Sequence, residues 1–102
     1  MTSASAPSTE RTSTERTLRE LRDEIEQLDE TIIATIARRT MLAREAGRVK
    51  VASGQPITDP AREAAVVSRA SVLARAAGLP DDEIRALYWQ LMALSRRVQM
   101  ER

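Results

Sequence analysis

A long stretch without proline is the feature that most constrains how this chain can fold. No proline stands between Pro7 and Pro56, and Gly47 is the only glycine before Gly54. Within the stretch, apolar residues recur every three or four positions, which is the spacing of one helical face. These residues are Leu18, Leu21, Ile25, Leu28, Ile32 and Ile36. The pattern predicts one helix from about residue 16 to about residue 52, roughly 55 Å long.

Such a helix is too long for a single small subunit to cover. A globule of 102 residues is only about 25–30 Å across. Two shorter helices of the same chain therefore leave part of the apolar stripe uncovered. We expect a second copy of the chain to cover it, in a homodimer.

The rest of the chain predicts two further helices. Residues 53–56 form a turn, and Asp59 followed by Pro60 is typical of a helix start. This second helix should run to about Ala77 and end at Gly78. The third should begin at Pro80 and Asp81, with acidic residues at its positive end. Its apolar stripe comprises Ile84, Leu87, Tyr88, Leu91 and Val98. The predicted fold is all-α, with three helices per chain and a long first helix.

Composition narrows the possible chemistry. The chain has no Cys and no His, which excludes disulfides, cysteine zinc sites, thiol nucleophiles and histidine proton shuttles. Its net charge of +1 does not suggest a nucleic-acid or membrane-surface protein. Residues 1–17 are rich in Ser and Thr and lack an apolar run of signal-peptide length. We expect a flexible tail on a soluble, cytoplasmic protein, followed by one domain over residues 18–102.

Polar residues continue the apolar faces of the first and third helices. Arg39 and Lys50 are 11 residues apart, so they project from one side of the helix, with backbones about 16 Å apart. Ser95 and Gln99 occupy inward positions of the third helix. Either pair could bind a ligand, but a solvated helix end or a buried polar network would also explain them. Near the start of the second helix, Asp59, Arg62 and Glu63 could equally be a cap with ordinary surface charges.

Arg22 provides a geometric test of a shared site. It precedes Arg39 by 17 residues, hence by roughly 26 Å along the helix. Both cannot hold one small molecule within a single chain. If both serve the same site, Arg22 must come from the other subunit, as an antiparallel pairing of two long helices permits.

In combination these residues resemble the all-α (AroQ-type, type II) chorismate mutase family. Residues 21–50 are similar to the family's first helix, and the resemblance covers residues 18 to about 101. The matching elements are Arg22, Leu28-Asp29, Arg39, Gly47 to Lys50, Pro56 to Asp59, Arg62-Glu63, and Ser95 with Gln99. The order and spacing of the whole set make the resemblance specific.

The resemblance implies an interlaced homodimer with two active sites. It also implies conversion of chorismate to prephenate, for phenylalanine and tyrosine biosynthesis, by a Claisen rearrangement that uses no metal and no cofactor. Catalysis would then consist of holding the compact substrate conformer and stabilising negative charge on the departing ether oxygen.

The same resemblance implies a role for each residue. Arg39 and the partner subunit's Arg22 would clamp carboxylates, and Ser95 would help to bind one. Lys50 and Gln99 would donate hydrogen bonds to the ether oxygen. Glu63, with Asp59 nearby, would engage the ring hydroxyl, and Arg62 would support the site electrostatically. Arg39, Lys50 and Gln99 are thus the expected catalytic residues.

Three alternatives remain open from the sequence. A related mutase could act on 4-amino-4-deoxychorismate in an antibiotic pathway, because an amine would also be attracted by Glu63. An isochorismate-pyruvate lyase could use a similar pericyclic site. A non-catalytic helical dimer that serves as an adaptor would require the polar residues to be structural or solvated.

Overall fold

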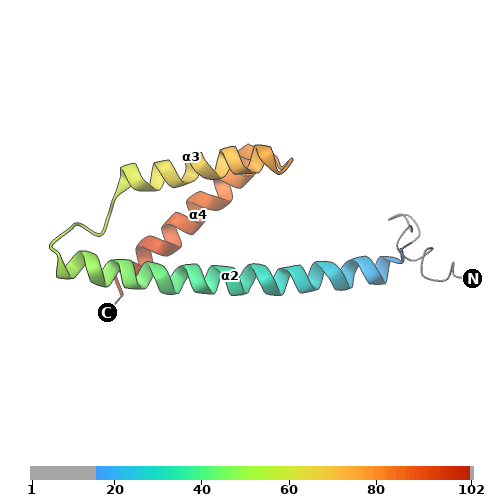
Figure 1. The fold of residues 1–102 in the computed structure, drawn as a ribbon, viewed down its shortest axis with the longest axis horizontal. Helices are drawn as coiled ribbons and strands as arrows, with labels where there is room; N and C mark the ends of the chain where they lie inside the picture. Colours follow the sequence, from blue (N-terminus) through green and yellow to red (C-terminus); the bar gives the residue numbers. More distant parts are fainter. Residues whose placement is uncertain (1–15, 102) are drawn as a thin grey trace, which may run out of the picture. The chain divides into compact units, whose positions relative to one another are not determined.

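A computed structural model of the protein describes residues 16–101. Within this range the chain forms α2 (Leu18–Ala52), α3 (Pro60–Ala76) and α4 (Asp81–Gln99), without a strand (Figure 1). The all-α prediction and the long first helix are therefore confirmed. The first fifteen residues of the predicted tail lie outside the described residues. No helix of the described part has the length and apolar character needed to cross a membrane.

Local capping interactions define both ends of α2. Thr17 Oγ1 accepts from the Glu20 amide at 3.0 Å, and Glu20 Oε1 accepts from the Thr17 amide at 3.2 Å. This reciprocal capping box satisfies two amides that lack helical partners. At the other end, the Gln55 amide donates to Lys50 O at 2.8 Å, and Gly54 has a φ of 74°. A left-handed glycine is the usual way to close a helix in this manner.

Capping interactions also define both ends of α3. The Asp59 side chain accepts from the Arg62 amide at 3.1 Å, and Pro60 occupies the first turn, as the sequence predicts. Beyond the helix, Gly78 has a φ of 76°, and the Leu79 amide reaches Ala74 O at 2.8 Å. Both ends of α3 are therefore specified by residues within one turn of them.

An ion pair connects the start of α4 to α3. Asp81 Oδ2 accepts from Arg75 Nη1 at 2.9 Å and from Ser71 Oγ at 3.2 Å. Desolvation raises the pKa of the Asp81 carboxyl, but the hydrogen bonds from Arg75 and Ser71 and the charge of Arg75 outweigh it, so the net shift is downward. Pro80 provides no side-chain cap for α4.

The chain divides into two compact units within α2, after Ile36. In the first unit, the apolar stripe of α2 faces solvent: Leu18, Ile25, Leu28 and Ile32 are 53–61% exposed. The intrachain structure therefore leaves this stripe uncovered, as the helix-length argument predicts.

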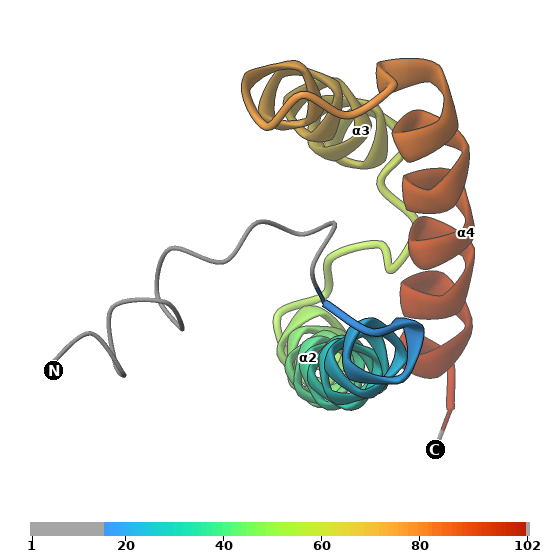
Figure 2. The same cartoon turned by 90° about the vertical axis from the view of Figure 1, so that its right-hand side faces the viewer.

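The second unit contains the end of α2 together with α3 and α4. In it, α4 begins beside the end of α3, packs against α3, and then diverges from it to end beside the C-terminal part of α2 (Figures 1 and 2). Its buried apolar residues are Ala43, Val67, Ala70, Ala74, Met92 and Val98. Within the predicted stripe of α4, Leu87 is instead 60% exposed, so helical periodicity overstated how much of this stripe the chain itself buries.

Candidate functional site

A cleft of about 370 Å³ opens in the second unit between the end of α2, the start of α3 and the last turns of α4. All the predicted site residues of this unit line it. These are Arg39, Lys50, Asp59, Arg62, Glu63, Ser95 and Gln99. The tertiary structure thus brings together residues from three separate parts of the sequence.

Arg39 and Ser95 join α2 to α4 on one side of the cleft. Arg39 Nη1 donates to Ser95 Oγ at 2.5 Å in a partly buried environment. A guanidinium has five N–H donors in a planar fork. This contact therefore orients Arg39 and leaves most of its donors available. The side chain can still present a flat pair of donors to a carboxylate.

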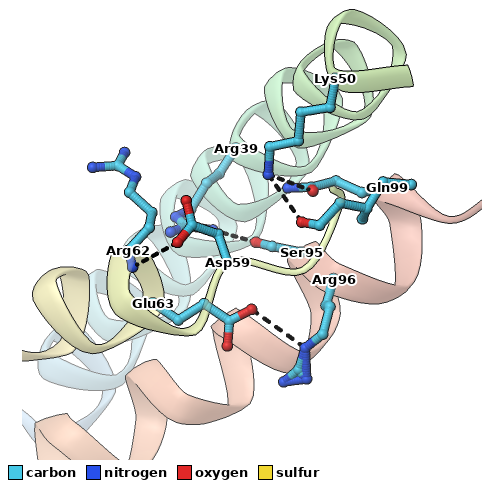
Figure 3. A network of polar contacts seen from close by, with 9 residues as sticks. Arg39, Lys50, Asp59, Arg62, Glu63, Ser95, Arg96 and Gln99 are labelled. Carbon is cyan, nitrogen blue, oxygen red and sulfur yellow. Dashed lines mark hydrogen bonds and ion pairs between the residues drawn. The ribbon is translucent and has the colours of Figure 1, made fainter. Parts of the chain in front are cut away.

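Lys50 and Gln99 form a second polar pair across the same two helices (Figure 3). Lys50 Nζ donates to Gln99 Oε1 at 3.0 Å and to the backbone carbonyl of Ile57 at 3.1 Å. An ammonium has three N–H donors, and an amide that accepts through oxygen retains its NH2 group. One lysine donor and the glutamine amide are therefore available to a bound molecule.

Acidic and basic side chains at the start of α3 complete the polar lining. The Asp59 side chain accepts a hydrogen bond as the N-cap of α3. Glu63 Oε2 accepts from Arg96 Nε of α4 at 3.3 Å. Arg62 also lines the cleft, with an exposed side chain.

The charge of the cleft favours an anion. Its lining includes the cations Arg39, Lys50 and Arg62 against the anions Asp59 and Glu63, and Glu63 is further neutralised by Arg96. The described residues contain no group of three or more His, Cys, Asp or Glu side chains that could hold a metal ion.

Apolar side chains form the remainder of the wall, and none of them was predicted to belong to the site. They are Leu42, Ala43, Ala46, Ile57, Val66 and Met92. A small carbon ring could contact them while its polar substituents meet the charged groups. Arg96 and the Ile57 carbonyl were likewise not predicted. Arg96 lies four residues after Met92 and three before Gln99, and this helical spacing could have indicated it.

Arg22 differs from the other predicted residues. It belongs to the first unit, on an exposed part of α2, and is not among the residues that line this cleft. Its role in the site therefore stays a prediction that depends on a second copy of the chain.

Comparison with known proteins identifies a family and two relatives of this chain. Residues 21–100 match the family described as Chorismate mutase type II. The T-protein of Enterobacter agglomerans is 36% identical over 72 residues, which are 71% of this chain and 19% of that protein. The T-protein of Haemophilus influenzae is 36% identical over 75 residues, 74% of this chain and 20% of that protein. The chain thus spans about a fifth of the length of these relatives. Because the family match covers most of the described helices and every polar residue of the cleft, the chain belongs to the chorismate mutase type II family.

Proposed function

We propose that this chain converts chorismate to prephenate in the cleft, on the route to phenylalanine and tyrosine in the cytoplasm. The observation that carries the proposal is the pairing of Lys50 with Gln99 at 3.0 Å beside a cleft that also contains Arg39. This arrangement places hydrogen-bond donors and cations around a space suited to a small anionic ring.

The proposed reaction suits the side chains present. In the rearrangement, the ether C–O bond breaks while a C–C bond forms, in one cyclic movement of electrons without proton transfer. The protein has to hold the enolpyruvyl arm over the ring and stabilise negative charge on the ether oxygen. The remaining N–H of Lys50 and the amide NH2 of Gln99 are the donors for that oxygen.

The two carboxylates of the substrate need separate partners. Arg39, oriented by Ser95, is suited to one of them through a bidentate contact. For the other we propose the partner subunit's Arg22. Arg62 is proposed to contribute positive potential at the cleft, and Asp59 and Glu63, which also line it, are proposed to engage the ring hydroxyl.

A homodimer is part of this proposal. It is supported by the exposed stripe of residues 18–32 on α2, because a contiguous apolar helix face of this length normally packs against another helix. Ile32→Lys should shift the protein toward monomers in analytical ultracentrifugation. Gln27→Lys introduces the same side chain on the opposite face of the helix and should leave the dimer intact; equal behaviour of the two variants would exclude the stripe as the interface.

Mixing two inactive variants tests whether the site is shared between subunits. When Arg22→Ala and Lys50→Ala proteins exchange subunits, each heterodimer should contain one site with neither substitution. Random exchange should restore about a quarter of wild-type activity, since half of the dimers are mixed and half of their sites are intact. A mixture of Arg39→Ala with Lys50→Ala should restore nothing, because both residues belong to the same cleft. No recovery in the first mixture would refute the contribution of Arg22 across the dimer.

The activity itself is tested by incubating the purified protein with chorismate. We expect loss of the ultraviolet absorbance of chorismate and formation of prephenate, identified by mass spectrometry and by its acid conversion to phenylpyruvate. Unchanged chorismate, with a folded and dimeric protein, would contradict the proposed function.

A further inference from the structure

The ion pair between Glu63 and Arg96 indicates which ring substituent the cleft accepts. Glu63 extends from α3 and Arg96 from α4, and their side chains meet at 3.3 Å (Figure 3). Their side chains are 18% and 34% exposed, so the contact is partly shielded from water. Glu63 lines the cleft, so its electrostatic environment bears directly on a bound ring.

A carboxylate that already pairs with a guanidinium differs from a free one as a binding partner. Its remaining oxygen can still accept a hydrogen bond from a neutral hydroxyl group. Its attraction for an ammonium group is weaker, because the charge of Arg96 offsets that of Glu63 and repels a second cation.

The other charged groups of the cleft do not compensate for the weaker attraction between Glu63 and an ammonium group. Asp59 is the remaining carboxylate, and its Oδ1 accepts from the Arg62 amide as the cap of α3. Arg39, Lys50 and Arg62 line the same cleft and are also unfavourable to a cation. Among the residues that line the cleft, both carboxylates therefore already have a partner, and cations outnumber them.

We infer that Arg96 is a specificity-determining positioning residue, which holds and neutralises Glu63 so that the site takes a ring hydroxyl rather than a ring ammonium. The inference rests on the proposed function, in which Glu63 faces this ring position. It favours chorismate over 4-amino-4-deoxychorismate, a choice that the sequence leaves open.

The test compares kcat/KM for these two substrates in the 102-residue chain. Wild type should prefer chorismate. Arg96→Gln removes the positive charge and should shift the ratio of kcat/KM values toward the amine by roughly two- to fivefold, the range for loss of a partly exposed ion pair. Arg96→Lys keeps the charge and should retain the wild-type preference. Arg97→Gln is the matched control, because Arg97 is exposed and does not line the cleft.

Each outcome separates this inference from the proposed function. If wild type converts neither substrate, both fail. If wild type converts chorismate but Arg96→Gln lowers kcat/KM for both substrates equally, Arg96 is structural and only the inference fails. A wild-type preference for the amine would also overturn it. Thermal unfolding and circular dichroism establish that the variants are folded. If Arg96→Gln unfolds, Arg96→Met takes its place, because it also removes the charge while keeping most of the apolar stem of the side chain.

Discussion

Gly47 of α2 lies directly against the backbone of Gln99 in α4. A Cβ atom at residue 47 would stand 2.8 Å from the carbonyl oxygen of Gln99 and 2.9 Å from its Cα. These distances are too short for real contacts, and the atoms involved are backbone atoms that cannot rotate away. Glycine therefore permits the approach of the two helices that brings Lys50 within 3.0 Å of Gln99.

Replacing this glycine should destabilise the protein although alanine is the better helix former. Helix propensity alone predicts that Gly47→Ala stabilises the protein by up to about 1 kcal/mol. Steric crowding against α4 should instead lower the free energy of unfolding by about 1–3 kcal/mol and reduce turnover, because Gln99 moves away from Lys50. Chemical denaturation and chorismate turnover measure the two effects. A stabilised and fully active variant would show that the helices can separate at no cost.

Loss of the Lys50 ammonium should strongly reduce catalysis. Lys50→Ala removes one donor to the ether oxygen, and the loss of such a donor costs on the order of 3–4 kcal/mol, or about 100- to 1,000-fold in kcat. Arg48→Ala is the matched control, because Arg48 lies on the same turn of α2 without lining the cleft. Similar rates for the two variants would remove Lys50 from the reaction.

The proposed hydrogen bond from Gln99 to the ether oxygen can be tested with a side chain that donates only at low pH. In Gln99→Glu, the side chain donates to the ether oxygen only when the carboxyl group is protonated. At neutral pH it should be a carboxylate that pairs with Lys50 and repels the developing negative charge. Activity should therefore rise as pH falls, while the wild type should not share this dependence. A pH–rate profile that is the same for both proteins would contradict the role of Gln99.

The Asp81 ion pair should make stability depend on acid pH. The pKa of Asp81 is lowered from 3.8 in the folded chain, so its stabilising contribution is present above about pH 4. As pH falls through the folded pKa, the carboxyl group is protonated and this contribution is lost. Asp81→Asn should thus lower the Tm at neutral pH, and the difference from wild type should shrink in acid.

The neighbouring Asp82 supplies the control for this experiment. It is exposed and lies in the same first turn of α4, so Asp82→Asn changes the charge near the helix dipole equally. It should affect the Tm less, because Asp82 does not share the contacts of Asp81 with Ser71 and Arg75. Equal Tm losses in the two variants would assign the effect to the dipole rather than to the α3–α4 contact.

Much of the fold follows from local sequence. The ends of α3 depend on Asp59 and Gly78, and each makes or permits hydrogen bonds within one turn of the helix. Such interactions do not require the rest of the protein, so the sequence predicts them well. The shared face of Arg39 and Lys50 follows in the same way from helical geometry.

The contacts of the site depend on more than helical periodicity. Ser95 and Gln99 are inward positions of α4 by their spacing, but their pairing with Arg39 and Lys50 joins residues 56 and 49 positions apart. Helical spacing places Arg96 near Gln99, but it does not predict the contact with Glu63, which lies 33 positions away on another helix. Periodicity shows which face a side chain occupies and does not show what stands opposite.

The sequence by itself determined the three helices, the ends of α3, the uncovered stripe of α2 and most of the polar residues near the cleft. Only the tertiary structure decided that Arg39 meets Ser95, that Lys50 meets Gln99 and that Arg96 neutralises Glu63. The physical reason is that capping and amphipathicity act over one or two helical turns. The crossing of α4 over α2 instead depends on close packing at Gly47, which involves distant parts of the chain.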